Sequence, residues 1–339
     1  MNDAELLPRL IGLHDRIRAA TRAALAAGSL STGGDPAAGE ARIAGEGAAD
    51  VTYGIDLPAE AEVESFAREL GRERPLVLIS EGSGETRPGG SPTAGAESLR
   101  LIVDPIDGTR NLAYDLRSAW ILTAVARDRG PATTSRDIFL AVQSEIPTRD
   151  SRSYHLLSAT RGGGARLSRR DLATGELLEE RTLAPSADAR LDNGFYVFFK
   201  FSPEERVALA QLEERFLCRV VAEHGVDRRT LCDDQYISNG GQLFLMMTQR
   251  YRFLADLRGL VGDRLGLQNF TSKPYDVCCA LIAEEAGIPI TDGAGQPLEV
   301  PLDATSRVSF VAYANPRVRT LLEPLLLEAL AELPRQDGR

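Results

Sequence analysis

Two carboxylates three residues apart, Asp104 and Asp107, lie in the segment LIVDPIDGTRN at 101–111. A buried strand leads to Asp104, where Pro105 disfavours helix and should end the strand, and Gly108 permits a tight turn. The backbone amides of 109–111 are then expected at a helix start, where N–H groups bind phosphate. Carboxylates hold hard cations such as Mg²⁺. A metal site beside an anion site is what phosphoryl hydrolysis requires, although the same run is also typical of an Asx turn before a helix cap.

Three further acids could join this pair. Glu81 follows the apolar run PLVLIS at 75–80, Asp276 lies in the first turn of an expected helix, and Asp56 precedes another. Each has a plainer explanation. Glu81 could be merely solvated on its turn, the helix dipole alone favours Asp276, and Asp56 could be an N-cap. The sequence leaves both explanations open.

The elements that position these acids follow from apolar periodicity and turn residues. In the first half we expect helices over 4–27 and 57–71, loops over 28–50 and 82–98, and strands over 75–80 and 99–103. Strands over 119–126, 138–144 and 153–159, closed by a hairpin turn at 162–164, predict an antiparallel meander.

The second half alternates helices and strands. Helices are expected over 203–216, 240–251, 275–286 and 316–332, with strands near 193–199, 251–256 and 308–313. Strands and helices grouped in layers predict an α+β layered sandwich. We divide the chain into an N-terminal half, 1–160, with most candidate metal ligands, and a C-terminal half, 161–339, with the last ligand and substrate-facing residues.

The charge balance limits the partners. The formal net charge is −10, which argues against nucleic-acid binding and against docking on an anionic membrane. It does not exclude a phosphorylated substrate, because bound cations reverse the local sign. The N-terminal segment carries charges among its apolar residues, unlike a signal peptide, and no apolar run is long enough to span a membrane. We expect a cytoplasmic protein.

The segment from Asp104 to Thr109 resembles the central motif of the inositol monophosphatase family, Asp-Pro-Ile/Leu-Asp-Gly-Thr/Ser. This family belongs to the lithium-sensitive, magnesium-dependent phosphatase superfamily that includes fructose-1,6-bisphosphatases. Three weaker motifs follow the family's order: TYGIDLPAE at 52–60, Ile79-Ser80-Glu81, and PYDVCCALIAEEAGIPITD at 274–292. The resemblance covers roughly 45–145 and 235–315. It implies an αβαβα sandwich of the sugar-phosphatase type, a homodimer and inhibition by lithium.

The resemblance also implies roles for individual residues. Two or three Mg²⁺ ions would be held by four carboxylates and one carbonyl, those of Glu81, Asp104, Asp107, Asp276 and Ile106. The catalytic groups would be Thr109, hydrogen-bonded to Asp56, and Glu81; they would orient and deprotonate a water that attacks phosphorus directly, without a phosphoenzyme. The small phosphorylated substrate would contact Gly108, Thr109, Arg110 and Asp256.

Several positions depart from the family pattern. Gly82 stands where many members carry a second acid, and 239–242 replaces a Gly-Ser-Ala-Ala-like turn. The segment 257–273 is longer than usual, and 165–192 has no clear counterpart. These departures put inositol phosphate in doubt as the substrate. The alternatives on the same fold are a fructose-1,6-bisphosphatase and a 3′(2′),5′-bisphosphate nucleotidase.

Two other functional classes share part of this pattern. An aspartyl-phosphate phosphatase needs Asp-x-Asp, whereas two residues separate Asp104 from Asp107. A catalytically inactive binding protein could keep the fold, but clustered acids repel one another and cost stability unless a cation is present. The sequence therefore favours hydrolysis of a small phosphate monoester.

Overall fold

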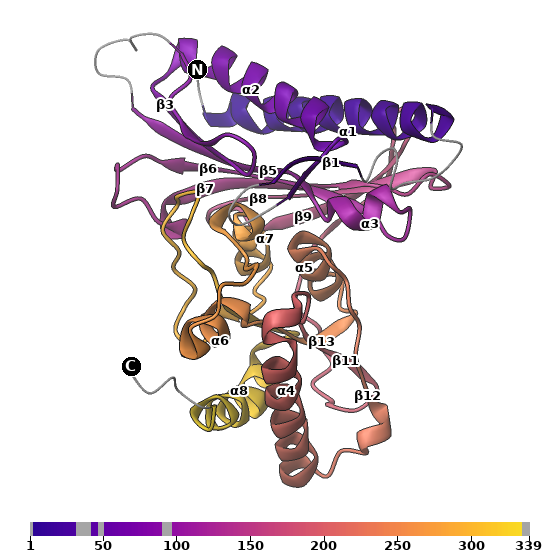
Figure 1. The fold of residues 1–339 in the computed structure, drawn as a ribbon, viewed down its shortest axis with the longest axis vertical. Helices are drawn as coiled ribbons and strands as arrows, with labels where there is room; N and C mark the ends of the chain where they lie inside the picture. The colour runs from indigo at the N-terminus through magenta and orange to yellow at the C-terminus, as the bar shows by residue number, and fades with distance from the viewer. Residues whose placement is uncertain (1–2, 32–41, 47–50, 90–96, 334–339) are drawn as a thin grey trace.

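The chain folds into alternating layers of helices and sheets. The computed structural model describes residues 3–31, 42–46, 51–89 and 97–333. Figure 1 shows helices α1 and α2 at the top, the eight-stranded sheet beneath them, helices α5 and α7 below that sheet, and in the lower half the five-stranded sheet beside helices α4, α6 and α8. Their bounds are Leu6–Ser31, Asp56–Glu73, Asn239–Met247, Ala280–Glu285, Pro203–His224, Arg258–Leu265 and Pro316–Ala331, respectively. This order confirms the predicted α+β layered sandwich.

The first sheet contains the predicted meander. Its strand order is β10-β9-β8-β7-β6-β5-β3-β4, and every neighbouring pair is antiparallel except β3 with β5. Along the chain these strands are β3 Leu76–Ser80, β4 Gly84–Thr86, β5 Leu99–Asp107, β6 Ala119–Arg127, β7 Ile138–Ile146, β8 Ser153–Thr160, β9 Ala165–Asp171 and β10 Leu177–Thr182. Because β9 and β10 continue this sheet, it extends beyond residue 160, where the two halves were divided.

Strand β5 does not end at Asp104, contrary to the expectation from Pro105. It continues to Asp107 through a bulge, since Asp104 pairs with Leu122 while Asp107 pairs with Trp120. Proline cannot donate to a ladder and is tolerated at bulges. The bulge therefore accommodates Pro105 and brings the second aspartate to the end of the same strand.

The upper core lies between this sheet and helices α1 and α2. The predicted helical spacing in 4–27 is confirmed, because Leu6, Leu10, Leu13 and Ile17 are completely buried. Burial of each such side chain stabilises the fold by about 1.5–3 kcal/mol. This packing fixes α2, and with it Asp56, against the sheet that carries Asp104.

The second sheet has the order β12-β11-β13-β15-β14. Its strands are β11 Gly194–Phe198, β12 Leu231–Cys232, β13 Tyr251–Asp256, β14 Ile290–Thr291 and β15 Phe310–Tyr313. Phe198 and Phe253 pack against Phe216 of α4 in the lower core. Helix α4 in turn packs against α6 and α8.

Three predictions, two of loops and one of a helix, were wrong in part. The expected loop over 28–50 contains the end of α1 and strand β1, Ile43–Glu46, which pairs with β2, Val51–Tyr53; residues 32–41 and 47–50 lie outside the described ones. The loop over 82–98 contains β4, and its residues 90–96 are likewise not described. The helix over 275–286 is divided into the 3₁₀ helix η4, Pro274–Val277, and α7.

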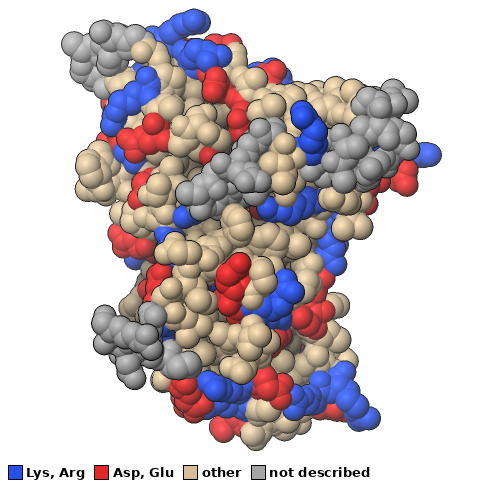
Figure 2. Space-filling view, in the orientation of Figure 1, with Lys and Arg blue, Asp and Glu red and all other residues tan. Residues whose placement is uncertain are grey.

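Charged residues of both signs are interspersed on the face shown in Figure 2. In the described part of the chain, none of the helices combines the length and the apolar character needed to cross a bilayer.

Candidate active site

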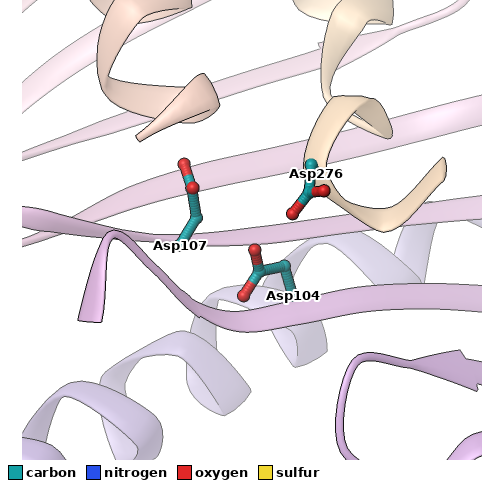
Figure 3. A group of neighbouring side chains, drawn as sticks. All are labelled: Asp104, Asp107 and Asp276. Carbon is teal, nitrogen blue, oxygen red and sulfur yellow. The ribbon is translucent and has the colours of Figure 1, made fainter. Parts of the chain in front are cut away.

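Three carboxylates from two distant segments meet at the end of β5. Asp104 and Asp107 come from β5, and Asp276 comes from η4. Each offers an oxygen, and these oxygens lie within 4.8 Å of one another. Figure 3 shows the carboxylates of Asp104 and Asp276 pointing toward each other across the space between strand and helix. The structure thus brings together three of the four predicted carboxylate ligands.

Burial gives this group unusual electrostatics. Asp104 is only 1% exposed. Burial raises the pKa of its carboxyl well above the usual range, and the carboxylates of Asp107 and Asp276 raise that pKa further. Burial also raises the pKa of Asp107 to about 6, although hydrogen bonds offset part of the rise. Because desolvation and mutual repulsion both disfavour the charged forms, a bound cation would relieve the group.

Asp107 is held by the N-terminus of α5. Ser238, the N-cap of this helix, donates from Oγ to Asp107 Oδ2 at 2.7 Å, and the amide of Gly240 donates to the same oxygen at 2.6 Å. The amide of Asn239 donates to Oδ1 at 3.2 Å. The run 239–242, where the sequence departs from the family pattern, therefore positions a metal-ligand candidate.

The backbone around Ile106 organises the strand end. The Ile106 amide donates to Asp104 Oδ1 at 3.0 Å, and the Ile106 carbonyl accepts from Thr109 Oγ1 at 2.8 Å. Asp276 is oriented in a similar way, because the amide of Lys273 donates to its Oδ2 at 2.6 Å. These backbone amides orient the carboxylates of Asp104 and Asp276.

The predicted contact between Thr109 and Asp56 is present. Thr109 Oγ1 lies 3.0 Å from Asp56 Oδ1, and the Tyr53 amide donates to Asp56 Oδ2 at 2.7 Å. Asp56 makes no side-chain cap for α2, whose N-cap is Ile55. Asp56 therefore does not act as the N-cap of α2.

The turn before Thr109 requires glycine. Gly108 has φ +95° and caps α3, Thr109–Ala113. A Cβ there would also lie 3.0 Å from Ser238 Cβ. Only glycine adopts this conformation readily. The turn places Gly108 and Thr109 in the lining of the pocket that also contains the carboxylates.

Glu81 lines the same pocket from the end of β3, outside the close group of three. Its neighbour Gly82, which departs from the family pattern, lies close to the carboxylate of Glu60. A Cβ at position 82 would lie 1.9 Å from Glu60 Oε1. Glu60 occupies that space, and burial raises the pKa of its carboxyl.

Asp256 lies elsewhere than the sequence suggested. It is fully buried and does not line the pocket. Its oxygens accept from Arg258 at 2.6 and 2.9 Å, from Ser272 at 2.6 Å and from Asn239 at 3.0 Å. The predicted direct contact between Asp256 and the substrate is therefore corrected. Asp256 instead holds Arg258, which does line the pocket.

Sequence reasoning missed several pocket residues. Besides Ser238 and Arg258, the pocket is lined by Phe199, Phe201 and Phe270. The long 257–273 segment gave a signal, since its last residues form one wall. The 165–192 segment contributes no described residue to the pocket and extends the far edge of the sheet.

Comparisons with known proteins agree with this architecture. No protein-family model matches the chain. A fructose-1,6-bisphosphatase/inositol-1-monophosphatase from Methanothermobacter thermautotrophicus is 25% identical over 266 residues, 77% of this chain and 78% of that protein. The predicted resemblance to the inositol monophosphatase superfamily is confirmed by this relative.

Solved structures share the fold at low identity. The fructose-1,6-bisphosphatase of Leishmania major has a TM-score of 0.67 and 14% identity, covering 96% of this chain and 94% of that one. Inositol monophosphatase II of Staphylococcus aureus has a TM-score of 0.60 and 16% identity, with 99% of both chains covered. These likenesses establish the layered fold that surrounds the carboxylates.

Proposed function

We propose that the protein is a magnesium-dependent phosphoric monoester hydrolase that cleaves a small phosphate monoester by direct attack of water. The observation that carries the proposal is the close group of oxygens from Asp104, Asp107 and Asp276 beside the first turn of α3. The relatives support it, because they are named as phosphatases of inositol monophosphate or fructose-1,6-bisphosphate.

The donors suit a hard cation. All three carboxylates offer only oxygen, and two of them are buried with raised pKa values, which fits Mg²⁺ better than a metal that prefers nitrogen or sulfur. The Ile106 carbonyl and Glu81 would complete the ligand set. Bound Mg²⁺ supplies a Lewis acid that neutralises phosphate charge and lowers the pKa of a coordinated water.

Thr109 and Asp56 would handle the proton of the attacking water. A hydroxyl has one proton, so Thr109 Oγ1 donates to either Asp56 or the Ile106 carbonyl. When it donates to Asp56, its lone pairs can accept from water and orient the nucleophile, and the buried carboxylate draws the proton away. Glu81 lies on the same pocket and would accept from the water as a second base.

The first amides of α3 would hold the phosphate. Backbone N–H groups of Gly108 and Thr109 lie at a helix start, where anions are favoured. Arg110 lines the pocket next to them. The phosphate would then be held between these donors and the carboxylate-bound cations, in position for in-line attack.

The test is phosphate release from a panel of inositol phosphates, fructose-1,6-bisphosphate, other sugar phosphates and adenosine 3′,5′-bisphosphate, with Mg²⁺ or with chelator. We expect chelator-sensitive release from at least one compound. Asp104→Asn should lower turnover by about 10²-fold or more, because a charged ligand becomes neutral. The matched control is Asp171→Asn, in an exposed turn, which should be unaffected.

Two results would contradict the proposal. One is hydrolysis by Asp104→Asn at the rate of the unmodified protein. The other is a folded protein that releases phosphate from none of these esters and whose melting temperature ignores Mg²⁺, which would favour the binding-protein alternative.

A further inference from the structure

A second pocket, here called the arginine pocket, lies at the β10 edge of the eight-stranded sheet. Strands β8, β9 and β10 form it together with the end of α5, and its volume is about 150 Å³. It shares no lining residue with the candidate active site. Its polar lining residues are His155, Arg169, Glu179, Arg181, Thr248 and Arg250. Because pockets for drug-sized ligands measure roughly 300–1,000 Å³, this one suits a smaller ligand.

The arginine pocket carries an excess of positive charge. Three arginines and one glutamate line it, which leaves a formal charge of +2 in a chain whose net charge is −10. Glu145 lies outside the lining, and its oxygens are already engaged: they accept from His155 Nδ1 at 2.7 Å and from Ser118 Oγ at 2.6 Å. A cavity lined by one sign of charge concentrates ions of the opposite sign. The pocket therefore attracts an anion.

The donors of the three guanidinium groups are largely unused. Arg181 is exposed, and no described residue forms a hydrogen bond or an ion pair with its side chain. Arg169 approaches Glu179 only at 3.6 Å, in an exposed pair of the kind that contributes little. Arg250 donates to Thr248 Oγ1 at 2.5 Å and has no carboxylate partner among the described residues. Since a guanidinium has five donors, most of them remain available to a ligand.

The end of α5 does not compete for these donors. Arginine side chains often satisfy the last carbonyls of a helix, but here the amides of 248–250 donate to the carbonyls of 244–246 at 2.8–3.0 Å. Phe244 gives the pocket a fixed apolar side, because its ring packs 4.6 Å from Trp120 and 4.9 Å from His155. Capping of the helix therefore does not account for Arg250.

We propose that the arginine pocket binds a small dianionic oxyanion, either free phosphate or the phosphate group of a monoester, between Arg169, Arg181 and Arg250. A dianion matches the formal charge of +2, and the planar guanidinium fork fits pairs of phosphate oxygens. The anion links β9 and β10, which belong to the 165–192 segment, to the chain that follows α5. This inference does not rest on the proposed hydrolysis, because the two pockets are built from different residues.

The first test measures binding without turnover. Isothermal titration calorimetry of the full chain with chelator present compares inorganic phosphate, glycerol 1-phosphate and acetate at equal ionic strength. We expect one saturable site for phosphate, with a dissociation constant of about 1 mM or lower. Acetate should bind about tenfold more weakly, because it carries one charge fewer and fewer acceptor oxygens. The tighter of the two phosphates identifies the occupant as free phosphate or as a monoester, whereas no saturable binding of either, or equal binding of acetate, would overturn the proposal.

Variants of exposed and partly exposed residues test the ligand set. Arg181→Gln and Arg250→Gln should each weaken phosphate binding about fivefold or more, since each removes charge-assisted hydrogen bonds. Glu179→Gln removes the one acid among the described lining residues, so binding should tighten about threefold. The matched control is Arg166→Gln, an exposed arginine of β9 that pairs with Glu180 at 3.5 Å outside the pocket. An effect of Arg166→Gln equal to that of Arg181→Gln would reduce the binding to general charge and overturn the site.

Hydrogen exchange locates the anion independently of its affinity. Strand β10 is an edge strand whose six residues are all exposed. Saturating phosphate should slow the exchange of its amides about twofold or more, because the anion ties the strand to its neighbours, and Arg181→Gln should abolish this protection. Arg110→Gln is the comparison for the other pocket. If phosphate binding is lost in Arg110→Gln and kept in Arg181→Gln, the anion lies beside the carboxylates and the proposal is wrong.

Discussion

Gly240→Ala should separate the α5 N-terminus from Asp107. A Cβ at position 240 would lie 2.6 Å from Leu122 Cδ2, 2.9 Å from Asp107 Oδ2 and 3.2 Å from Trp120 Cβ. The peptide is held on both sides, because its amide donates to Asp107 and its carbonyl accepts from Gln143 at 2.8 Å. The helix can make room only by moving away from the carboxylate.

The change in the free energy of unfolding follows from two destabilising contributions and one stabilising contribution. Overpacking a rigid site costs about 1–3 kcal/mol. Weakening a hydrogen bond to a charged group costs roughly 1.5–3 kcal/mol. Alanine in place of glycine inside a helix returns about 0.8–1.0 kcal/mol. We therefore expect a net loss of about 2–4 kcal/mol in the free energy of unfolding.

The assay is urea unfolding with chelator and with Mg²⁺, read as a midpoint shift at constant slope. Gly12→Ala is the matched control, since it lies inside α1 and a Cβ there meets nothing within 4 Å; it should gain up to about 1 kcal/mol. The Mg²⁺-induced stabilisation of Gly240→Ala should also be smaller. If Gly240→Ala unfolds at or above the urea concentration of the unmodified protein, the tight contact with Asp107 does not exist in solution.

Two further predictions address proton transfer and stability. Thr109→Val keeps the side-chain shape but removes the hydroxyl next to Asp56, so kcat should fall by about 10²–10⁴-fold while Mg²⁺ still raises the melting temperature; unchanged kcat would remove Thr109 from the mechanism. His14 is fully buried, and burial lowers its pKa from 6.5 to about 3. Below pH 6.5 the unfolded chain takes up a proton that the folded protein does not, so unfolding should become easier by about 1.4 kcal/mol per pH unit from 6.5 down to 3. Replacement by His14→Gln should flatten that part of the stability curve measured by urea unfolding at several pH values, and an identical curve would refute the buried neutral imidazole.

Local patterns predicted most of the elements. The spacing of Leu6, Leu10 and Leu13 fixed one face of α1, because a helix repeats its side chains every three to four residues. The alternating strands and turns of 119–160 predicted the meander in the same way. Two features were missed: strand β4, which pairs with its chain neighbour β3, and the division between η4 and α7, where the Lys273 amide donates to Asp276.

The sequence by itself indicated which acids could form the site, since Asp104, Asp107 and Gly108 lie within five residues of one another and their chemistry is local. Only the tertiary structure decided what surrounds them. The amide of Gly240 reaches Asp107 across 133 positions of the chain, and Asp256 turns inward to hold Arg258 instead of facing the pocket. Such contacts depend on how two sheets and their helices pack, and packing joins residues whose separation in sequence carries no information about their distance in space.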